Sequence, residues 1–179
     1  MTLTAEERRI VISPTPPSTP RLQLQHPNSV HTLLDGGWWP RSTDPLAELP
    51  GLILAIDALH GPVKQIMLNV GDWAEHPRRL GVAGRIVRIG YFASQPERLL
   101  TALSSRSGDR VDLFVVPADT DAPVADAAMA LAATAGNQIH AGHILRTVQT
   151  PSLATTNDEP EDTWEGEGGH LVSVTASRP

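Results

Sequence analysis

Apolar and polar residues alternate along much of the middle of the chain, and this pattern predicts β-strands. Residues 21–25 (RLQLQ) alternate strictly, as a strand with one buried face does. Other runs are rich in β-branched and aromatic residues and lie between turn residues, which is typical of strands in a sheet. The segment 97–104 fits a helix or a strand, and its alternating leucines favour a strand. The predicted strands are 21–25, 30–34, 63–70, 80–92, 97–104 and 109–117.

Two further segments have helical patterns. Leucines and isoleucines recur every three or four residues over 49–59 and make one apolar helix face. Asp44, followed by proline, is suited to the N-cap, and Gly61, also followed by proline, to the helix end. Because a proline cannot lie deep in a helix, we expect the main helix to begin near Pro50, after a separate short turn. The second predicted helix spans 123–137.

The order of these elements indicates the fold class. Strands that follow one another through short connections pair antiparallel, and helices then cover the sheet. We therefore predict an α+β fold with a mainly antiparallel sheet of five to six strands and two helices packed on one face.

The domain boundaries follow from composition. Residues 13–20 (SPTPPSTP) hold four prolines, which excludes a helix or a central strand and is typical of a linker. We therefore expect a flexible N-terminal arm over 1–20, in which ERRIVI is a candidate edge strand, and a single domain over 21–146. Residues 147–179 lack periodicity and are polar and acidic, which predicts a disordered tail.

Charge and composition exclude several functional classes. The formal net charge is −6, and beyond residue 151 six acidic residues face one arginine, a net −5. The domain is therefore nearly neutral, which is a poor match for nucleic-acid binding. The chain has no cysteine, so thiol chemistry and cysteine-ligated metals are excluded. No run approaches the roughly 20 apolar residues of a membrane span, and we expect a cytoplasmic protein.

The stretch LDGGWWPRSTDP (34–45) is the first candidate site. Its two adjacent tryptophans point in opposite directions if the backbone is extended, so Trp38 and Trp39 can serve different purposes. Arg41 beside an aromatic ring is suited to binding a carboxylate or phosphate, and Asp35 is a candidate acid or base. The simpler interpretation, which we favour, is a packed corner in which Gly36 and Gly37 permit a turn.

The loop NVGDWAEHPRR (69–79) is the second candidate. Asn69 and Trp73 are suited to binding a ligand, and Asp72, Glu75 and His76 to acid/base chemistry, although an ordinary surface loop has the same composition.

Two other clusters carry weaker signals. Arg85, Arg88 and Tyr91 on one strand would suit single-stranded nucleic acid, but the two arginines lie on opposite faces. His140 and His143 have metal-ligand spacing without a third ligand, so we predict no metal site and no cofactor.

Four motifs in order, LDGGWWPRSTDPLAELP, NVGDW, GRIVRIGYF and VDLFVVPADT, resemble those of an uncharacterised family of small actinobacterial proteins, a domain of unknown function. The resemblance covers residues 21–137. It implies a single domain in a bacterial cytoplasm, and it implies no activity, substrate or cofactor.

These observations favour a binding or regulatory module over an enzyme. We expect Asp35, Trp38, Trp39, Arg41, Asn69 and Trp73 to recognise a small anion or a protein segment, and Trp164 in the acidic tail to bind a partner. The alternatives are a small hydrolase-like enzyme that uses the 69–79 loop and a binder of single-stranded nucleic acid.

Overall fold

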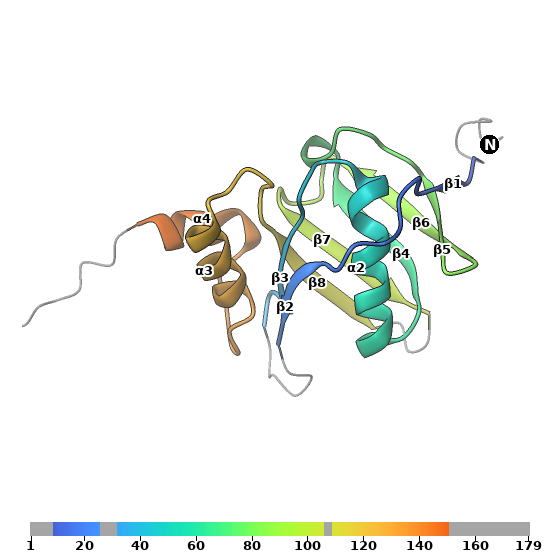
Figure 1. Cartoon of the computed structure of the whole chain (residues 1–179). Helices are drawn as coiled ribbons and strands as arrows, with labels where there is room; N and C mark the ends of the chain where they lie inside the picture. Colours follow the sequence, from blue (N-terminus) through green and yellow to red (C-terminus); the bar gives the residue numbers. More distant parts are fainter. Residues whose placement is uncertain (1–8, 26–31, 106–108, 151–179) are drawn as a thin grey trace, which may run out of the picture.

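Figure 1 shows the computed structural model, which describes residues 9–25, 32–105 and 109–150. The described residues form one mixed sheet, three α-helices and a short 3₁₀ turn. The elements are β1 (Val11–Ile12), β2 (Arg21–Leu24), β3 (Gly36–Trp39), α2 (Pro45–His60), β4 (Val63–Asn69), η1 (Val70–Asp72), β5 (Arg79–Val82), β6 (Arg85–Phe92), β7 (Leu99–Ser104), β8 (Arg110–Val115), α3 (Ala122–Ala132) and α4 (Ala141–Gln149).

The sheet has eight strands in the order β1-β5-β6-β4-β7-β8-β3-β2. Most neighbouring pairs are antiparallel, whereas β1/β5, β4/β6 and β3/β8 are parallel. The predicted α+β class with a mainly antiparallel sheet is therefore confirmed. The predicted numbers of strands and helices are too low, because the candidate edge strand in ERRIVI is present as β1, one predicted strand is two, and α4 is an additional helix.

The predicted strand 80–92 is a hairpin of β5 and β6. The chain reverses at Ala83 and Gly84, whose φ angles of 49° and 74° are both positive, as in the tight turns that suit hairpins. Gly84 is therefore a turn residue and the predicted single strand is interrupted there. Residues Val87, Ile89 and Tyr91 of β6 are buried together, as the alternation predicts.

The predicted strand at 30–34 is not found over residues 32–34, whereas residues 30 and 31 lie outside the described residues; the strand is β3, the GGWW segment itself. Its glycines do not form a turn. They permit close approach of neighbouring elements: a Cβ on Gly37 would lie 2.6 Å from the Cα of Met129 in α3. The extended backbone sends Trp38 and Trp39 into two different hydrophobic clusters, as predicted for adjacent strand residues.

Helix α2 is a single helix that contains Pro50, contrary to the predicted break there. Asp44 caps it by accepting a hydrogen bond from the amide of Leu46 at 2.8 Å, and Gly61 ends it with a φ of 80°. A proline inside a helix costs about 3 kcal/mol. Burial of one leucine or isoleucine contributes about 1.5–3 kcal/mol, and four such residues, Leu49, Leu52, Ile53 and Ile56, are fully buried, so packing outweighs the proline.

The helices cover both faces of the sheet, not one face as predicted. Leu113 packs in the cluster beneath α2, and its neighbour Phe114 packs with α3 and α4 on the other face. Figure 1 shows α2 across the sheet, with α3 and α4 gathered at the end that carries β3 and β8. Among the described helices, none covers the face of β5 and β6 opposite α2, at the far end of the sheet.

The proline-rich segment 13–20, here called the strap, crosses the outer side of α2 (Figure 1). A Cβ on Gly51 of α2 would lie 1.9 Å from the carbonyl oxygen of Ser18, so strap and helix backbone are in direct contact. Arg41 donates from Nη1 to the carbonyl oxygen of Thr19 at 3.1 Å. Ahead of the strap, β1 pairs with β5 at the edge of the sheet. The strap therefore closes the side of α2 that the sheet leaves open.

We predict that Gly51→Ala lowers the free energy of unfolding by about 1–3 kcal/mol, because the new methyl group overlaps the strap backbone. Urea denaturation measures the difference.

Gly142→Ala in α4 is the matched control, because a Cβ there meets nothing within 4 Å. Replacement of glycine by alanine in an open helix position is expected to raise stability by about 0.5–1 kcal/mol. A Gly51→Ala protein that is as stable as Gly142→Ala would show that the strap does not bear on α2.

Candidate functional site

Several strand ends meet at one edge of the sheet, uppermost in Figure 1. Strands β3 and β8 are parallel, and β7 runs antiparallel to both β4 and β8. The carboxyl ends of β3, β4 and β8 therefore lie at the same edge as the amino end of β7. The loops that leave or enter these strands come together there, and such edges are common positions for binding sites.

A pocket of about 300 Å³ lies between these loops. Four chain segments form its walls: the segments that follow β3, η1 and β8, and the segment that precedes β7. The lining residues are Pro40, Ser42, Thr43, Asp72, Trp73, Arg98, Val115, Val116, Pro117, Ala118 and Asp119.

Trp73 fixes the floor of this pocket. Its ring stacks on that of Trp38, with 5.8 Å between centroids and 18° between planes, and both side chains are buried. The next residue, Ala74, donates from its backbone amide to the carbonyl oxygen of Thr43 at 3.1 Å. The loop after β4 is thus attached both to the core and to the segment before α2, which makes the pocket wall rigid.

Arg98 is the cationic residue of the pocket. Its φ of 60° is unusual for a residue with a side chain, and Asp72 holds this conformation by accepting from the Arg98 backbone amide at 2.8 Å. The Nη1 atom is buried and has no hydrogen-bond partner among the residues that the structure describes. A buried donor without a partner is costly, and Arg98 Nη1 shares this state with Trp39 Nε1 and the Tyr91 hydroxyl, but only Arg98 lines the pocket.

Asp72 is half-buried beside Arg98. Burial raises the pKa of Asp72, while the hydrogen bond from the Arg98 amide and the positive charge of Arg98 act in the opposite direction. The hydroxyl of Ser42 already has a hydrogen-bond acceptor, because it donates to the buried carboxylate of Glu48 at 2.9 Å. The pocket lining thus includes one guanidinium, that of Arg98, and two carboxylates, those of Asp72 and Asp119. Another wall of the pocket is apolar.

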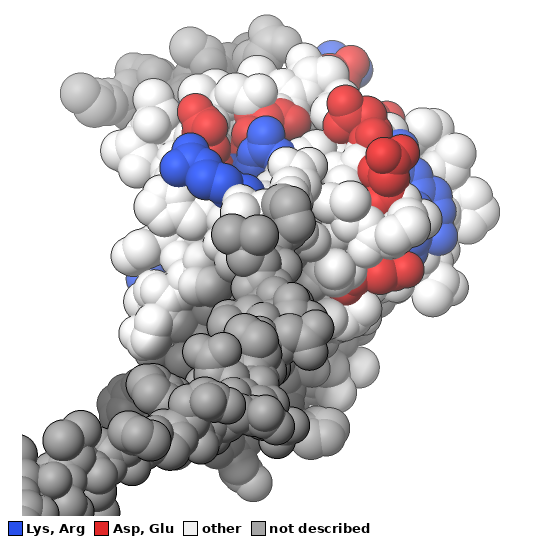
Figure 2. Space-filling view, turned by 90° about the vertical axis from the view of Figure 1, so that its left-hand side faces the viewer, with Lys and Arg blue, Asp and Glu red and all other residues white. Residues whose placement is uncertain are grey.

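Charges around the α3 and α4 end of the molecule are mixed in sign. Figure 2 shows basic and acidic side chains next to one another in the upper part of this view. Most of the other described residues in this view are uncharged. Among the described residues visible in this view, charges of one sign do not gather into an extended patch.

The tryptophan pair of β3 does not line the pocket. Trp39 packs under α3 and α4, and its ring is covered by Arg21, whose guanidinium carbon lies 3.4 Å from the ring centroid. Arg21 also donates to the carbonyl oxygens of Trp39 and Pro40. The arginine that stacks on a tryptophan is therefore Arg21, whereas Arg41 is exposed and contacts the strap.

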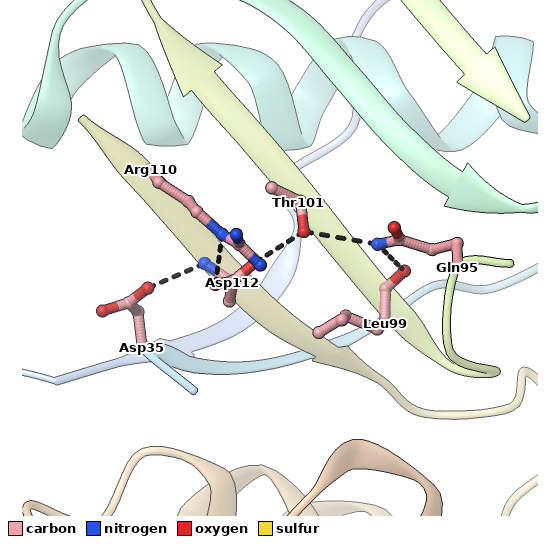
Figure 3. Close-up of polar contacts among 6 residues, drawn as sticks. All are labelled: Asp35, Gln95, Leu99, Thr101, Arg110 and Asp112. Atoms are coloured by element: carbon pink, nitrogen blue, oxygen red, sulfur yellow. Dashed lines mark hydrogen bonds and ion pairs between the residues drawn. The ribbon is translucent and has the colours of Figure 1, made fainter. Parts of the chain in front are cut away.

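Asp35 belongs to a polar network on the face opposite α2 (Figure 3). Its Oδ2 accepts from the backbone amide of Asp112 at 2.7 Å, and Asp112 in turn accepts from Thr101 and Arg110. Gln95 continues the network by donating to Thr101 at 3.3 Å. Burial raises the pKa of Asp35. The network ties β8 to β7 and to the segment that enters β3, which is a structural role.

Two residues of the 69–79 loop also have structural contacts. Asn69 caps η1 by accepting from the amide of Gly71 at 2.7 Å and donates to the carbonyl oxygen of Gln95 at 2.6 Å. The ring of His76 packs edge-on against Tyr91 and contacts the carbonyl oxygen of Val70. Asp35, Arg41, Asn69 and His76 each have separate partners, and none of them lines the pocket.

The remaining candidates are dispersed. Arg85 pairs with Asp57, and Arg88 lies on the opposite face of β6, as expected from the alternation. Within the described part of the chain, no group of histidine, aspartate and glutamate could hold a metal, and His140 and His143 are exposed. No described helix is long and apolar enough to cross a membrane. Trp164 lies outside the described residues.

These features define a small α+β domain in which a mixed sheet curves around one helix and forms a pocket at its edge. The chain belongs to a family of unknown function (DUF5994), whose model matches residues 21–132. This confirms the resemblance to an uncharacterised domain. No curated protein and no solved structure matches the chain. All residues of the pocket fall within the matched range, whereas the strap and α4 lie outside it.

The sequence patterns singled out Trp73 and Asp72 but missed Arg98. Arg98 stands in the segment PERLL, where neither a motif nor an aromatic neighbour marks it. Its importance comes from a positive φ and from a buried donor, which depend on tertiary contacts. The proline and serine before it in SQPER do indicate a turn at this place, and that was the available signal.

We predict that Arg98→Gly raises the free energy of unfolding by about 1 kcal/mol, because glycine adopts a positive φ without steric cost. Thermal and urea denaturation of the two proteins measure the change. Ala83→Gly, at a φ of 49° in the β5–β6 turn, is the matched control and should give a similar gain. A loss of stability in Arg98→Gly alone would mean that the arginine side chain supports the fold.

We also predict that Asp35→Asn changes the dependence of stability on pH. Because burial raises the pKa of Asp35 above 3.8, the folded protein holds this proton more tightly than the unfolded chain. The wild type is therefore favoured relative to Asp35→Asn at low pH and loses that advantage as the pH rises through the raised pKa. Urea titrations between about pH 3 and 7 measure this, with the exposed Asp126→Asn as the control for net charge. If the stability of the wild type relative to Asp35→Asn increased as the pH rises, the raised pKa of Asp35 would be contradicted.

Proposed function

We propose that this domain is a binding module for a small molecule that carries a carboxylate, and that Arg98 recognises this group in the pocket. The observation that carries the proposal is that Arg98 lines the pocket and that its buried Nη1 atom has no hydrogen-bond partner among the described residues. Arginine suits this role because its guanidinium binds carboxylates through directed hydrogen bonds. As part of the proposal, we place this function in the cytoplasm.

The balance of charge in the pocket favours a singly charged anion. Asp72 and Asp119 share the lining with Arg98, so a doubly charged phosphate would meet more repulsion than a carboxylate. The stacked Trp73 and the residues Val115 to Pro117 supply an apolar wall for the body of the ligand. A volume of about 300 Å³ is at the lower limit of ordinary ligand pockets, which indicates a small metabolite-sized ligand.

The backbone conformation of Arg98 supports a functional role for this residue. A residue with a side chain costs about 1 kcal/mol or more at a positive φ, and a glycine would avoid that cost. Strained backbone that is held by its surroundings is typical of ligand sites. Here Asp72 provides the support through its bond to the Arg98 amide.

Binding is a better proposal than catalysis. An acid/base enzyme would depend on Asp72, whose pKa is raised and which lines the pocket. One oxygen of Asp72 already binds the Arg98 amide, and the other candidate groups of the 69–79 loop, Glu75 and His76, do not line the pocket. The pocket therefore lacks the partners from the 69–79 loop, Glu75 and His76, on which the enzymatic alternative depends.

We predict that benzoate binds the protein and that benzamide, its neutral analogue of the same shape, binds at least about tenfold more weakly. A charge-assisted hydrogen bond to arginine contributes about 1.5–3 kcal/mol, which accounts for that ratio. Because benzoate is so small, we expect a dissociation constant in the millimolar range. The shift of the Trp73 indole N–H signal in ¹⁵N NMR spectra measures binding, with Trp73→Phe to assign the signal.

Arg98→Asn should abolish the benzoate response, since asparagine tolerates a positive φ and removes the guanidinium. Arg88→Asn, at an exposed position of β6, is the control and should bind as the wild type does. Inorganic phosphate is the third probe and should bind more weakly than benzoate. Equal binding of benzoate and benzamide, or an unchanged response in Arg98→Asn, would refute the proposal.

A further inference from the structure

The face of β5 and β6 opposite α2 carries two unpaired arginines. Arg79 and Arg88 are directly opposite each other in the antiparallel ladder, and their neighbours Leu80 and Val87 point into the core. The two guanidinium groups therefore project from the same outer face. Within the described ranges, neither arginine has an ion pair or a side-chain hydrogen bond. Like charges that are directly opposite in a sheet are destabilising, so this pair lacks a counter-charge.

Exposed apolar side chains surround this pair. Ile86 and Phe92 lie on the same face of β6 as Arg88 and are 47% and 43% exposed. On the other side, Ile12 of β1 lies over Gly81, with its Cγ1 atom 3.2 Å from where a Cβ of that glycine would be. We call Ile12, Arg79, Ile86, Arg88 and Phe92 the outer patch. Its combination of apolar groups and cationic groups is typical of an interaction surface.

The helices that cover this face stop short of the outer patch. Helices α3 and α4 pack on the side of the sheet that carries Phe114, which is also opposite α2, but only at β3 and β8. Figure 1 shows them at one end of the sheet and β5 and β6 at the other. The end of α4, from which the chain continues, therefore lies over the same face of the sheet as the outer patch.

The chain beyond α4 has the complementary chemistry. Residues 158–167 (DEPEDTWEGE) contain six acidic residues and Trp164. Seven residues lie between Thr150 and Asp158, and an extended chain spans about 3.3–3.6 Å per residue. From β8 to β6 the sheet is three strand spacings wide, roughly 15 Å, so this segment has sufficient length to reach the outer patch.

We propose that residues 158–167 of this chain bind the outer patch, with acidic side chains against Arg79 and Arg88 and with Trp164 on the exposed apolar groups. Three arguments support this occupant: opposite charge, an aromatic residue to cover Ile86 and Phe92, and a connection that begins on the same side of the sheet. The attachment also favours the segment over a free partner, because a tethered ligand has an effective concentration in the millimolar range.

Quenching of tryptophan fluorescence by acrylamide in the full chain tests this proposal, because Trp38, Trp39 and Trp73 are buried and quenchable emission then reports Trp164. Trp164→Phe establishes that assignment. We expect Trp164 to be protected in the wild type at low salt and to become several-fold more quenchable in about 1 M NaCl, where charges are screened within about 3 Å.

Arg88→Glu should expose Trp164 to the same extent, whereas Arg146→Glu, the same change at an exposed position of α4, should not. Arg88→Glu keeps the fold intact because it places a carboxylate opposite Arg79. Full quenching of Trp164 in the wild type, or protection that persists in Arg88→Glu, would overturn the proposal. Protection that increases with protein concentration would also overturn it, since a second copy would then occupy the patch.

Discussion

Helix α2 has apolar side chains on nearly all sides, and the rest of the structure depends on covering it. A helix of this kind is stable only when it is buried on most of its surface. The sheet packs against it, with core residues from six strands in a single cluster and the partly buried leucines of β2 packed against that cluster. The strap covers a side of α2 that the sheet leaves open, at Gly51 and Ser18. The prolines of the strap suit this role, because they hold an extended chain without amide donors that would need partners.

The same requirement places the pocket. Because the sheet wraps α2, the carboxyl ends of β3, β4 and β8 converge near the start of that helix. Trp73 folds back onto Trp38 there, and the loop that carries it brings Asp72 against the amide of Arg98. Trp38 of β3 thus lies in the core, and the ring of Trp73 stacks on it. The aromatic residues set the position of the pocket wall, and the polar residues of that wall provide its chemistry.

Local signals predicted most of the elements, and tertiary contacts decided the exceptions. Alternation located β2 and β7, a high content of β-branched and aromatic residues between turn residues located β4 and β8, and turn residues located both ends of α2. The break at Pro50 was wrong because burial outweighs the lost hydrogen bond. The GGWW segment was interpreted as a corner because glycine pairs commonly form turns, whereas here they permit close packing against β2 and α3. In the pocket, Asp72 and Trp73 could be predicted from an aromatic, polar loop. Arg98 could not, since a buried donor and a positive φ arise only when three loops come together.

The central claim is that the unpaired guanidinium of Arg98 receives a carboxylate in the pocket at the sheet edge. A crystal structure of the protein soaked with benzoate tests it most directly. The account predicts a carboxylate within hydrogen-bond distance of Arg98 Nη1, with the aromatic ring between Trp73 and the Val115–Pro117 wall. Arg98 Nη1 bonded to a protein group, with the pocket empty at a benzoate concentration that saturates the NMR response, would contradict it.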